Sequence, residues 1–288
     1  MDYWTIRRKV GRVYRARLAP SVDFVHYQIA KRWPYKVYVN LGGGPRFVAL
    51  RWRNFDGARG PFNPTTFEFG PDTRLPLEDG STRLVYSSHF LEHVPPETAA
   101  RIIAEAWRVL EKGRKLLLKI PDFDRSLKAW REGDESYHGN EEGWDFRSIT
   151  HTWKVKGVPD TIDYRTATVF CSYWNEAYGH HFSREISDSP QAYHGPPALP
   201  ADRLRKILSN DSPFQIAKEL REVALAECED LTFNHQCAWS RKELTDLVEG
   251  AGFRVVSMES RQIVERFSFV PGIRQMLPIS LYLEAVKP

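Results

Sequence analysis

The chain has 288 residues, which is long for one domain and predicts either one large domain with an insertion or two domains. Hydrophobic residues make up 42% of it and aromatic residues 13%, which excludes a disordered chain, and no apolar run approaches the ~18 residues of a membrane-spanning helix. The net charge of +4 is too small to indicate nucleic-acid binding by itself. Cys171, Cys228 and Cys237 show no CxxC spacing, so no disulfide framework is expected and a cytoplasmic location is predicted.

The first 35 residues form a basic segment. Arginines and a lysine are dense in "TIRRKVGRVYRARL", and Ile6, Val10 and Val13 recur there at helical spacing. This pattern is compatible with an amphipathic helix in peripheral contact with an anionic membrane. An ordinary N-terminal helix with a solvated basic face is the simpler interpretation.

Three consecutive glycines, Gly42, Gly43 and Gly44, follow the apolar run Val37-Tyr38-Val39. A second apolar run, "RFVALRW", leads on to Asp56. A strand, then glycines, then a second strand that ends at an acidic residue is the order of a nucleotide site in a parallel sheet. A tight turn is the alternative if only the glycines are considered.

Residues 71–123 predict a strand, a helix and a second strand. Arg83 to Ser87 has the pattern of a buried strand, and Lys115 to Ile120 has that of another. Between them, one helical face collects the apolar residues Ala99, Ile102, Ile103, Ala106, Trp107 and Leu110. Gly113 is placed to end that helix. This order favours a parallel α/β sheet.

Several of these stretches resemble the class I S-adenosylmethionine-dependent methyltransferases, especially the small-molecule branch. The matching stretches are "NLGGGPR", "LPLEDGSTRLVYSSHFLEH" and "RVLEKGR", in the order and at the intervals that are typical of this branch. Near the C-terminus, "WSRKELTDLVEGAGFRVVSMES" and "ISLYLEAVKP" resemble the helix and strands that follow the core in that family.

The resemblance implies a Rossmann-like, seven-stranded, mostly parallel sheet with helices on both faces, whose final strand is antiparallel. The methyltransferase core would comprise residues 36–123 and 231–288, and residues 124–230 would form a largely helical insertion after the fifth strand that recognises the substrate. The insertion is rich in aromatic rings that could bind an acceptor, although packing in its own small core is the simpler role for most of them.

The resemblance also implies an S-adenosylmethionine site. Its expected residues are Gly42, Gly43, Gly44, Asp56, Asp72, Ser87, Ser88 and His89, with Asp56 holding the ribose and Asp72 the adenine amine. The chain departs from the family pattern at Gly43, where a cysteine is usual, at Arg83, and at Lys112 and Arg114. These departures leave open a member that binds the cofactor without turnover.

Methyl transfer to a hydroxyl benefits from a general base, and histidine has a suitable pKa. The candidates for catalysis are His89, His93, His180, His181 and His235. Each of them could instead be a hydrogen-bonded structural residue. No metal site is expected, because the histidine spacing fits no standard zinc pattern.

We therefore expect methylation of a small-molecule or saccharide acceptor, on oxygen. The chain contains no "NPPY"-like or "DPPY"-like motif of the kind used on base amines, so no nucleic-acid partner is expected. A nicotinamide-dependent reductase would share the strand and glycine order but would not have the block from "SSHFLEH" to "RVL".

Overall fold

The computed structural model describes residues 37–44, 47, 49–58, 66–139, 161–171, 199–226 and 234–288. The basic segment predicted at residues 1–35 and the candidates His180 and His181 lie outside the described residues. Within the described ranges, no helix combines the length and the apolar character needed to cross a membrane.

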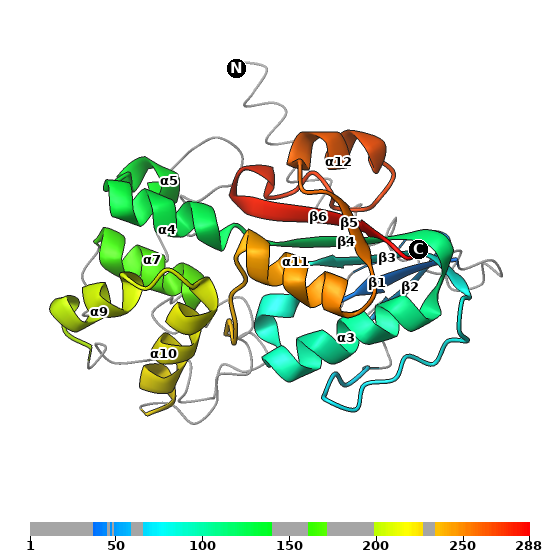
Figure 1. The fold of residues 1–288 in the computed structure, drawn as a ribbon, viewed down its shortest axis with the longest axis horizontal. Coiled ribbons are helices and arrows are strands. Elements are labelled where there is room, and N and C mark those ends of the chain that lie inside the picture. The colour runs from blue at the N-terminus through cyan, green and yellow to red at the C-terminus, as the bar shows by residue number, and fades with distance from the viewer. Residues whose placement is uncertain are drawn as a thin grey trace, which may run out of the picture.

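The described residues form a mixed sheet of six strands in the order β2-β1-β3-β4-β6-β5 (Figure 1). Strands β1 to β4 are parallel neighbours, and β6 is antiparallel to both β4 and β5. The α/β class and the antiparallel final strand are confirmed, and the seventh expected strand stays a prediction. The strand bounds are β1 Tyr38–Leu41, β2 Trp52–Phe55, β3 Thr82–Ser88, β4 Leu110–Pro121, β5 Arg254–Ser257 and β6 Ser280–Val286.

Both faces of the sheet are covered. Neighbouring residues of a strand point to opposite faces, so each strand contributes to two cores. Val85 and Leu118 face helices α3 (Pro96–Val109) and α11 (Arg241–Gly250) within one buried cluster. Tyr86 and Leu117 face the other side, where a second cluster includes α12 (Ser260–Arg266). Continuous apolar strands that alternate between two cores are typical of a parallel sheet with helices on both faces.

The predicted strand, helix and strand of residues 83–120 are present as β3, α3 and β4. The expectation that Gly113 ends the helix is wrong, because α3 ends at Val109 and Gly113 lies within β4 at φ +76°. Trp107 was expected on the buried face, yet it is 38% exposed and the ammonium of Lys287 lies 4.1 Å from the centre of its ring.

The connection between β1 and β2 is short, and its described residues contain no helix. Only residues 42–51 separate the two strands, and β2 begins at Trp52, the last residue of the apolar run in which a strand was expected. Parallel strands normally need a crossover of a dozen or more residues, usually helical. Here Phe47 and Ala49 pack on the cluster that contains Trp52, so the connection itself covers that part of the sheet.

The remaining helices lie beyond the carboxyl ends of the parallel strands (Figure 1). Asp163 joins three of them, accepting hydrogen bonds from Trp130 Nε1 at 2.8 Å and Arg205 Nε at 2.9 Å. Helices α9 and α10 belong to residues 124–230, which were expected to be largely helical. A substrate-recognition role for residues 124–230 stays a prediction. The bounds are α4 Phe123–Glu132, α5 Glu135–Gly139, α7 Ile162–Phe170, α9 Ala201–Leu208 and α10 Pro213–Leu225.

Candidate active site

The glycine loop follows β1 directly. Gly42 and Gly44 adopt φ values of +69° and +76°, which side chains other than that of glycine rarely tolerate. A Cβ atom on Gly42 would overlap the ring of Phe90, whereas one on Gly44 would meet no atom within 4 Å. The loop backbone therefore packs against an aromatic ring at Gly42 and borders open space at Gly44.

Gly43 is a glycine for a different reason. The side-chain amides of Asn40 and Asn54 form a 3.0 Å hydrogen bond beneath the loop, and Asn54 Nδ2 also donates to the carbonyl of Gly44 at 3.1 Å. A Cβ atom on Gly43 would overlap both amides. The absence of the family's usual cysteine is thus matched by a polar pair in the space that its side chain would need.

Asp56 lies one residue beyond β2 and is tied to the glycine loop. Its carboxylate accepts hydrogen bonds from the backbone N–H groups of Gly44 and Ala58, both at 2.7 Å. Burial raises the pKa of Asp56 above its usual range, and these two N–H groups oppose the shift. Both carboxylate oxygens of Asp56 are thus engaged by the backbone around the glycine loop.

Asp72 lies in an exposed turn between Gly70 and Thr73. A row of aromatic rings, each within 5.2 Å of the next between ring centres, runs beside this turn. The rings are those of Phe55, Phe67, Phe69 and Phe90. The row connects the end of β2 to the ring that packs on Gly42, so the segment before Asp72 is fixed beside the glycine loop.

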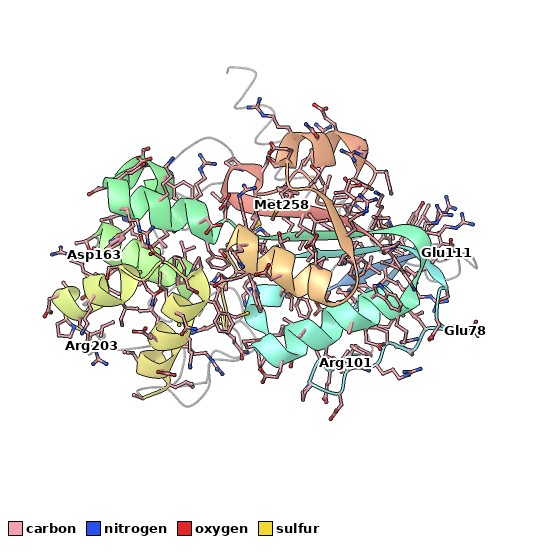
Figure 2. The ribbon with its side chains drawn as sticks, in the orientation of Figure 1. Glu78, Arg101, Glu111, Asp163, Arg203 and Met258 are labelled. Carbon is pink, nitrogen blue, oxygen red and sulfur yellow. The ribbon has the colours of Figure 1, made fainter. Side chains whose placement is uncertain are left out.

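Helix α3 holds the segment that follows Asp72. Arg101 Nε donates to the carbonyl of Thr73 at 2.7 Å, and Arg108 donates to the carbonyls of Leu75 and Leu77 at 3.0 and 2.8 Å. The buried carboxylate of Glu105 accepts from the backbone N–H of Leu75 at 2.8 Å. Figure 2 shows Arg101 on α3, on the side of the molecule where residues 70–80 pass.

The end of β3 carries the other expected contacts. The Ser87 hydroxyl donates to the carbonyl of Leu41 at 3.2 Å and so ties β3 to the last residue of β1, while Ser88 is partly exposed. His89 follows at φ +49°. Its Nε2 lies 2.8 Å from Ser280 Oγ, and its Nδ1 lies 3.3 Å from a carboxylate oxygen of Glu92.

These contacts suit both protonation states of His89. The Ser280 hydroxyl has one hydrogen and two acceptors within reach, Nε2 of His89 and the carbonyl of Met276 at 2.6 Å. A neutral ring that keeps its proton on Nδ1 accepts from Ser280, and a doubly protonated ring donates to Ser280, whose hydrogen then turns to Met276. The ring can therefore take up a proton without losing either partner.

Three of the predicted histidines converge on Glu92, a residue that our sequence analysis missed. Glu92 is fully buried in the 3-10 helix η2 (Leu91–His93), and the rings of His93 and His235 are 4.8 Å apart between centres. Nδ1 of His235 donates to the carbonyl of Val169 at 2.6 Å. The signal that could have identified Glu92 is a glutamate flanked by histidines three residues before it and one after it.

The charges in this cluster are set by burial. Burial lowers the pKa of His235 to about 3, with repulsion from His93 as the next cause, so this ring is neutral at neutral pH. Burial raises the pKa of Glu92, but the contact with His89 at 3.3 Å and the charges of the neighbouring histidines outweigh it, and the pKa lies below its ordinary value. Glu92 is therefore a buried carboxylate beside neutral His235.

The departures from the family pattern at Arg83 and Arg114 lie at the opposite end of the strands. Both side chains pair with Glu111, at 3.6 and 3.0 Å respectively. Figure 2 shows Glu111 on the side of the molecule far from Asp163 and the helices beyond the carboxyl ends of the strands. These substitutions therefore do not touch the glycine loop.

Several of the aromatic residues of the insertion are buried, which agrees with the simpler role given for most of them. Tyr137 and Tyr164 are 8% and 7% exposed, and Trp130 is bonded to Asp163. For these residues, packing between helices accounts for the ring. Of the other rings that the expectation covers, many lie outside the described residues.

Comparison with known proteins supports the assignment of the core. Residues 45–118 match a family model described as a methyltransferase domain. No curated protein matches the chain. The matched stretch covers about a quarter of the chain and includes β2, β3, α3 and most of β4, so this part of the core is similar to a methyltransferase domain.

Solved structures of S-adenosylmethionine-dependent methyltransferases also align along most of their length. One from Mesorhizobium loti is 14% identical, with 90% of this chain and 96% of that chain covered and a TM-score of 0.38. One from Thermotoga maritima is 14% identical, with 100% of both chains covered and a TM-score of 0.35. One from Archaeoglobus fulgidus is 12% identical, with 99% and 100% covered and a TM-score of 0.36. These scores are too low to assign a function.

Proposed function

We propose that this protein transfers the methyl group of S-adenosylmethionine to an oxygen of a small-molecule or saccharide acceptor. The observation that carries the proposal is the linked pair of Gly44 and Asp56, in which an open glycine backbone donates to the carboxylate that ends β2. Ligands of open α/β sheets bind outside the carboxyl ends of the strands, where this pair lies.

The residues present fit S-adenosylmethionine. Gly42 and Gly44 provide backbone without side chains, Asp56 provides acceptors for ribose hydroxyls, and Asp72 provides an exposed carboxylate for the adenine amine. When bound, the cofactor supplies an electrophilic methyl group to a nucleophile held in line with it. Ser87 contributes indirectly, because its bond to Leu41 fixes β3 against β1.

The short connection after β1 disfavours a dinucleotide cofactor. In dinucleotide sites the glycine loop opens a helix whose N-terminus binds the pyrophosphate. In residues 42–51 the described positions contain no helix, and position 47 interrupts any that could begin at the glycines. S-adenosylmethionine carries no phosphate and does not need that helix.

We assign His89 to accept the proton of a hydroxyl acceptor through Ser280, whose hydroxyl would pass its own hydrogen to Nε2 while it takes up the proton of the acceptor. His89 follows the end of β3, and its partners Ser280 and Glu92 accommodate the ring before and after proton uptake. The preference for a small-molecule or saccharide acceptor and for oxygen rests on the resemblance in sequence. The alternative of a cofactor-binding protein without turnover is disfavoured, because Arg83 and Arg114 lie away from the glycine loop.

Calorimetric titration of the purified protein with S-adenosylmethionine, S-adenosylhomocysteine and NADH tests the proposal. We expect binding of the first two alone. Asp56→Ala should weaken that binding at least about 100-fold, since two charge-assisted hydrogen bonds of ~1.5–3 kcal/mol each are lost. Glu68→Ala, which removes an exposed carboxylate from the same region, is the control. If Asp56→Ala bound S-adenosylmethionine with wild-type affinity, the assignment of Asp56 to the ribose would be contradicted.

A further inference from the structure

Two imidazoles and a carboxylate meet beside the end of β3. One ligand atom from each of Glu92, His93 and His235 lies within 4.8 Å of the other two. We propose that these three residues bind one divalent transition-metal ion. This goes beyond the methyl transfer proposed above, because displacement at a sulfonium needs no ion.

His235 has the surroundings of a metal ligand. Its Nδ1 donates to the carbonyl of Val169 at 2.6 Å, and this fixes the tautomer in which Nε2 carries the lone pair. Histidines that bind metals almost always donate their other nitrogen to a carbonyl or carboxylate in this way.

Glu92 provides the second, independent observation. Its side chain is 0% exposed, and neither carboxylate oxygen has a hydrogen-bond partner. The ion pair to His89 engages Oε1 at 3.3 Å, beyond ordinary hydrogen-bond length. A buried carboxylate with one long contact is costly, and a cation on its other oxygen would offset that cost.

The geometry requires only a small contraction. Ligands bound at ~2.1 Å to a tetrahedral ion are about 3.4 Å apart, so a pair of ligand atoms 4.8 Å apart must approach by about 1.4 Å, within reach of side-chain rotation. Two imidazoles with one carboxylate suit Zn²⁺, Co²⁺, Fe²⁺ or Mn²⁺ and do not suit Ca²⁺ or Mg²⁺, which prefer oxygen ligands.

Three protein ligands leave a coordination position open. Glu92 and His235 are buried, whereas His93 is partly exposed, so a ligand would approach from the side of His93. Glu92 lies two residues after Phe90, whose ring packs on Gly42 of the glycine loop. If the proposed function holds, the open position would take an oxygen of the methyl acceptor.

Cobalt is a suitable probe, because Co²⁺ in such a site absorbs visible light. We expect protein stripped with a chelator to bind one Co²⁺ with visible absorption bands, and Zn²⁺ in excess to displace it. Glu92→Gln and His235→Gln should each abolish the absorption. Glu97→Gln, which changes an exposed glutamate in the first turn of α3, is the matched control and should bind Co²⁺ as the wild type does.

The wild-type titration decides the question even if a variant does not fold. No Co²⁺ absorption and no heat with Zn²⁺ would overturn the proposal, and so would an undiminished signal in folded Glu92→Gln. Titration with S-adenosylmethionine on the same metal-free sample keeps the two proposals apart. Cofactor binding without metal binding would contradict only the proposed metal site. Metal binding without cofactor binding would contradict only the proposed methyl transfer.

Discussion

His89 combines an unfavourable backbone with two side-chain contacts. A left-handed conformation costs a residue other than glycine of the order of 1 kcal/mol or more, so surrounding bonds must hold it. Here they are the backbone N–H to the Lys119 carbonyl at 2.7 Å and the ring contacts to Ser280 and Glu92. Such strain at the carboxyl end of a strand is typical of a functional position.

His89→Asn tests this role while keeping a residue that tolerates the left-handed region. We expect the affinity for S-adenosylmethionine to stay within a few-fold of the wild type and kcat to fall by about 10²–10⁴, the contribution of a positioned general base. Steady-state kinetics with an identified acceptor measures kcat, and calorimetry measures cofactor affinity. An unchanged kcat would exclude His89 as the proton acceptor.

Lys119 predicts a pH dependence of stability. The side chain is 1% exposed, and its Nζ donates to the carbonyls of Gly272 and Gln275 at 3.0 and 3.1 Å. Burial lowers its pKa from 10.5 to about 8, against the opposing charge of Glu92. Between those two pKa values the unfolded chain binds more protons, so the free energy of unfolding rises with pH.

Urea denaturation of the wild type and Lys119→Met at several pH values measures the contribution of Lys119 to the free energy of unfolding. The stability of the wild type relative to Lys119→Met should increase by about 2 kcal/mol between about pH 7 and pH 9.5, with most of the change above the folded-state pKa. Lys128→Met, at an exposed position, controls for the loss of a positive charge. A constant difference between wild type and Lys119→Met would contradict the shifted pKa.

At the scale of elements, α3 positions the turn that carries Asp72. Arg108→Ala removes bonds to two carbonyls and leaves the buried Glu105 without its closest cation, 2.7 Å away. We expect a loss of about 3 kcal/mol in the free energy of unfolding, as for a broken buried pair, together with weaker cofactor binding.

Arg83→Ala is the matched control, because that arginine is 49% exposed and pairs with Glu111 across 3.6 Å. It should cost less than about 1 kcal/mol and leave cofactor binding unchanged. Denaturation and calorimetry on both variants make the comparison. Equal effects of the two substitutions would contradict the positioning role of Arg108.

Local sequence patterns predicted those helices and strands whose ends are set by residues within the element itself. Helix α11 begins at a Ser240 and Glu243 capping box and ends at Gly250, as its sequence indicates. The conformation of the connection after β1, where the described residues contain no helix, was not predictable, because "RFVALRW" is as apolar as a strand and its conformation depends on packing against Trp52. Likewise, Gly113 has the composition of a helix stop but serves a left-handed bend in β4.

In the candidate site, too, some features follow from local sequence and others depend on contacts between distant parts of the chain. Gly42, Gly44 and Asp56 follow from the order of residues within one short stretch. The convergence of His93 and His235 on Glu92 depends on how the segment before α11 returns to η2, where Gln236 and Cys237 donate backbone N–H groups to the Glu92 carbonyl. Contacts between residues so far apart in the chain have no local signature.

At the scale of the whole molecule, burial predicts the reactivity of the cysteines. Cys171 and Cys237 are 0% and 2% exposed, and burial raises the pKa of Cys237, with Glu92 as the next cause. Thiolates are the reactive form, so both should be inert in the folded protein. Cys228 lies outside the described residues.

A disulfide reagent such as Ellman's reagent should therefore label at most one thiol per folded chain and all three in denaturant. The slow labelling of the buried pair should follow global unfolding and become slower when S-adenosylmethionine is bound, since a ligand of the native state lowers the unfolded population. Rapid labelling of two or more thiols in native buffer would contradict the described packing.

The ten-residue connection of β1 to β2, residues 42–51, bears on how the chain folds. Pairing of parallel strands is usually slow, because a long crossover must be ordered before the strands meet. A connection this short lowers the entropic cost of closing the loop, because the paired residues of β1 and β2 are close in sequence. The edge of the sheet that carries Gly44 and Asp56 can thus assemble early, ahead of the strands contributed by the C-terminal part of the chain.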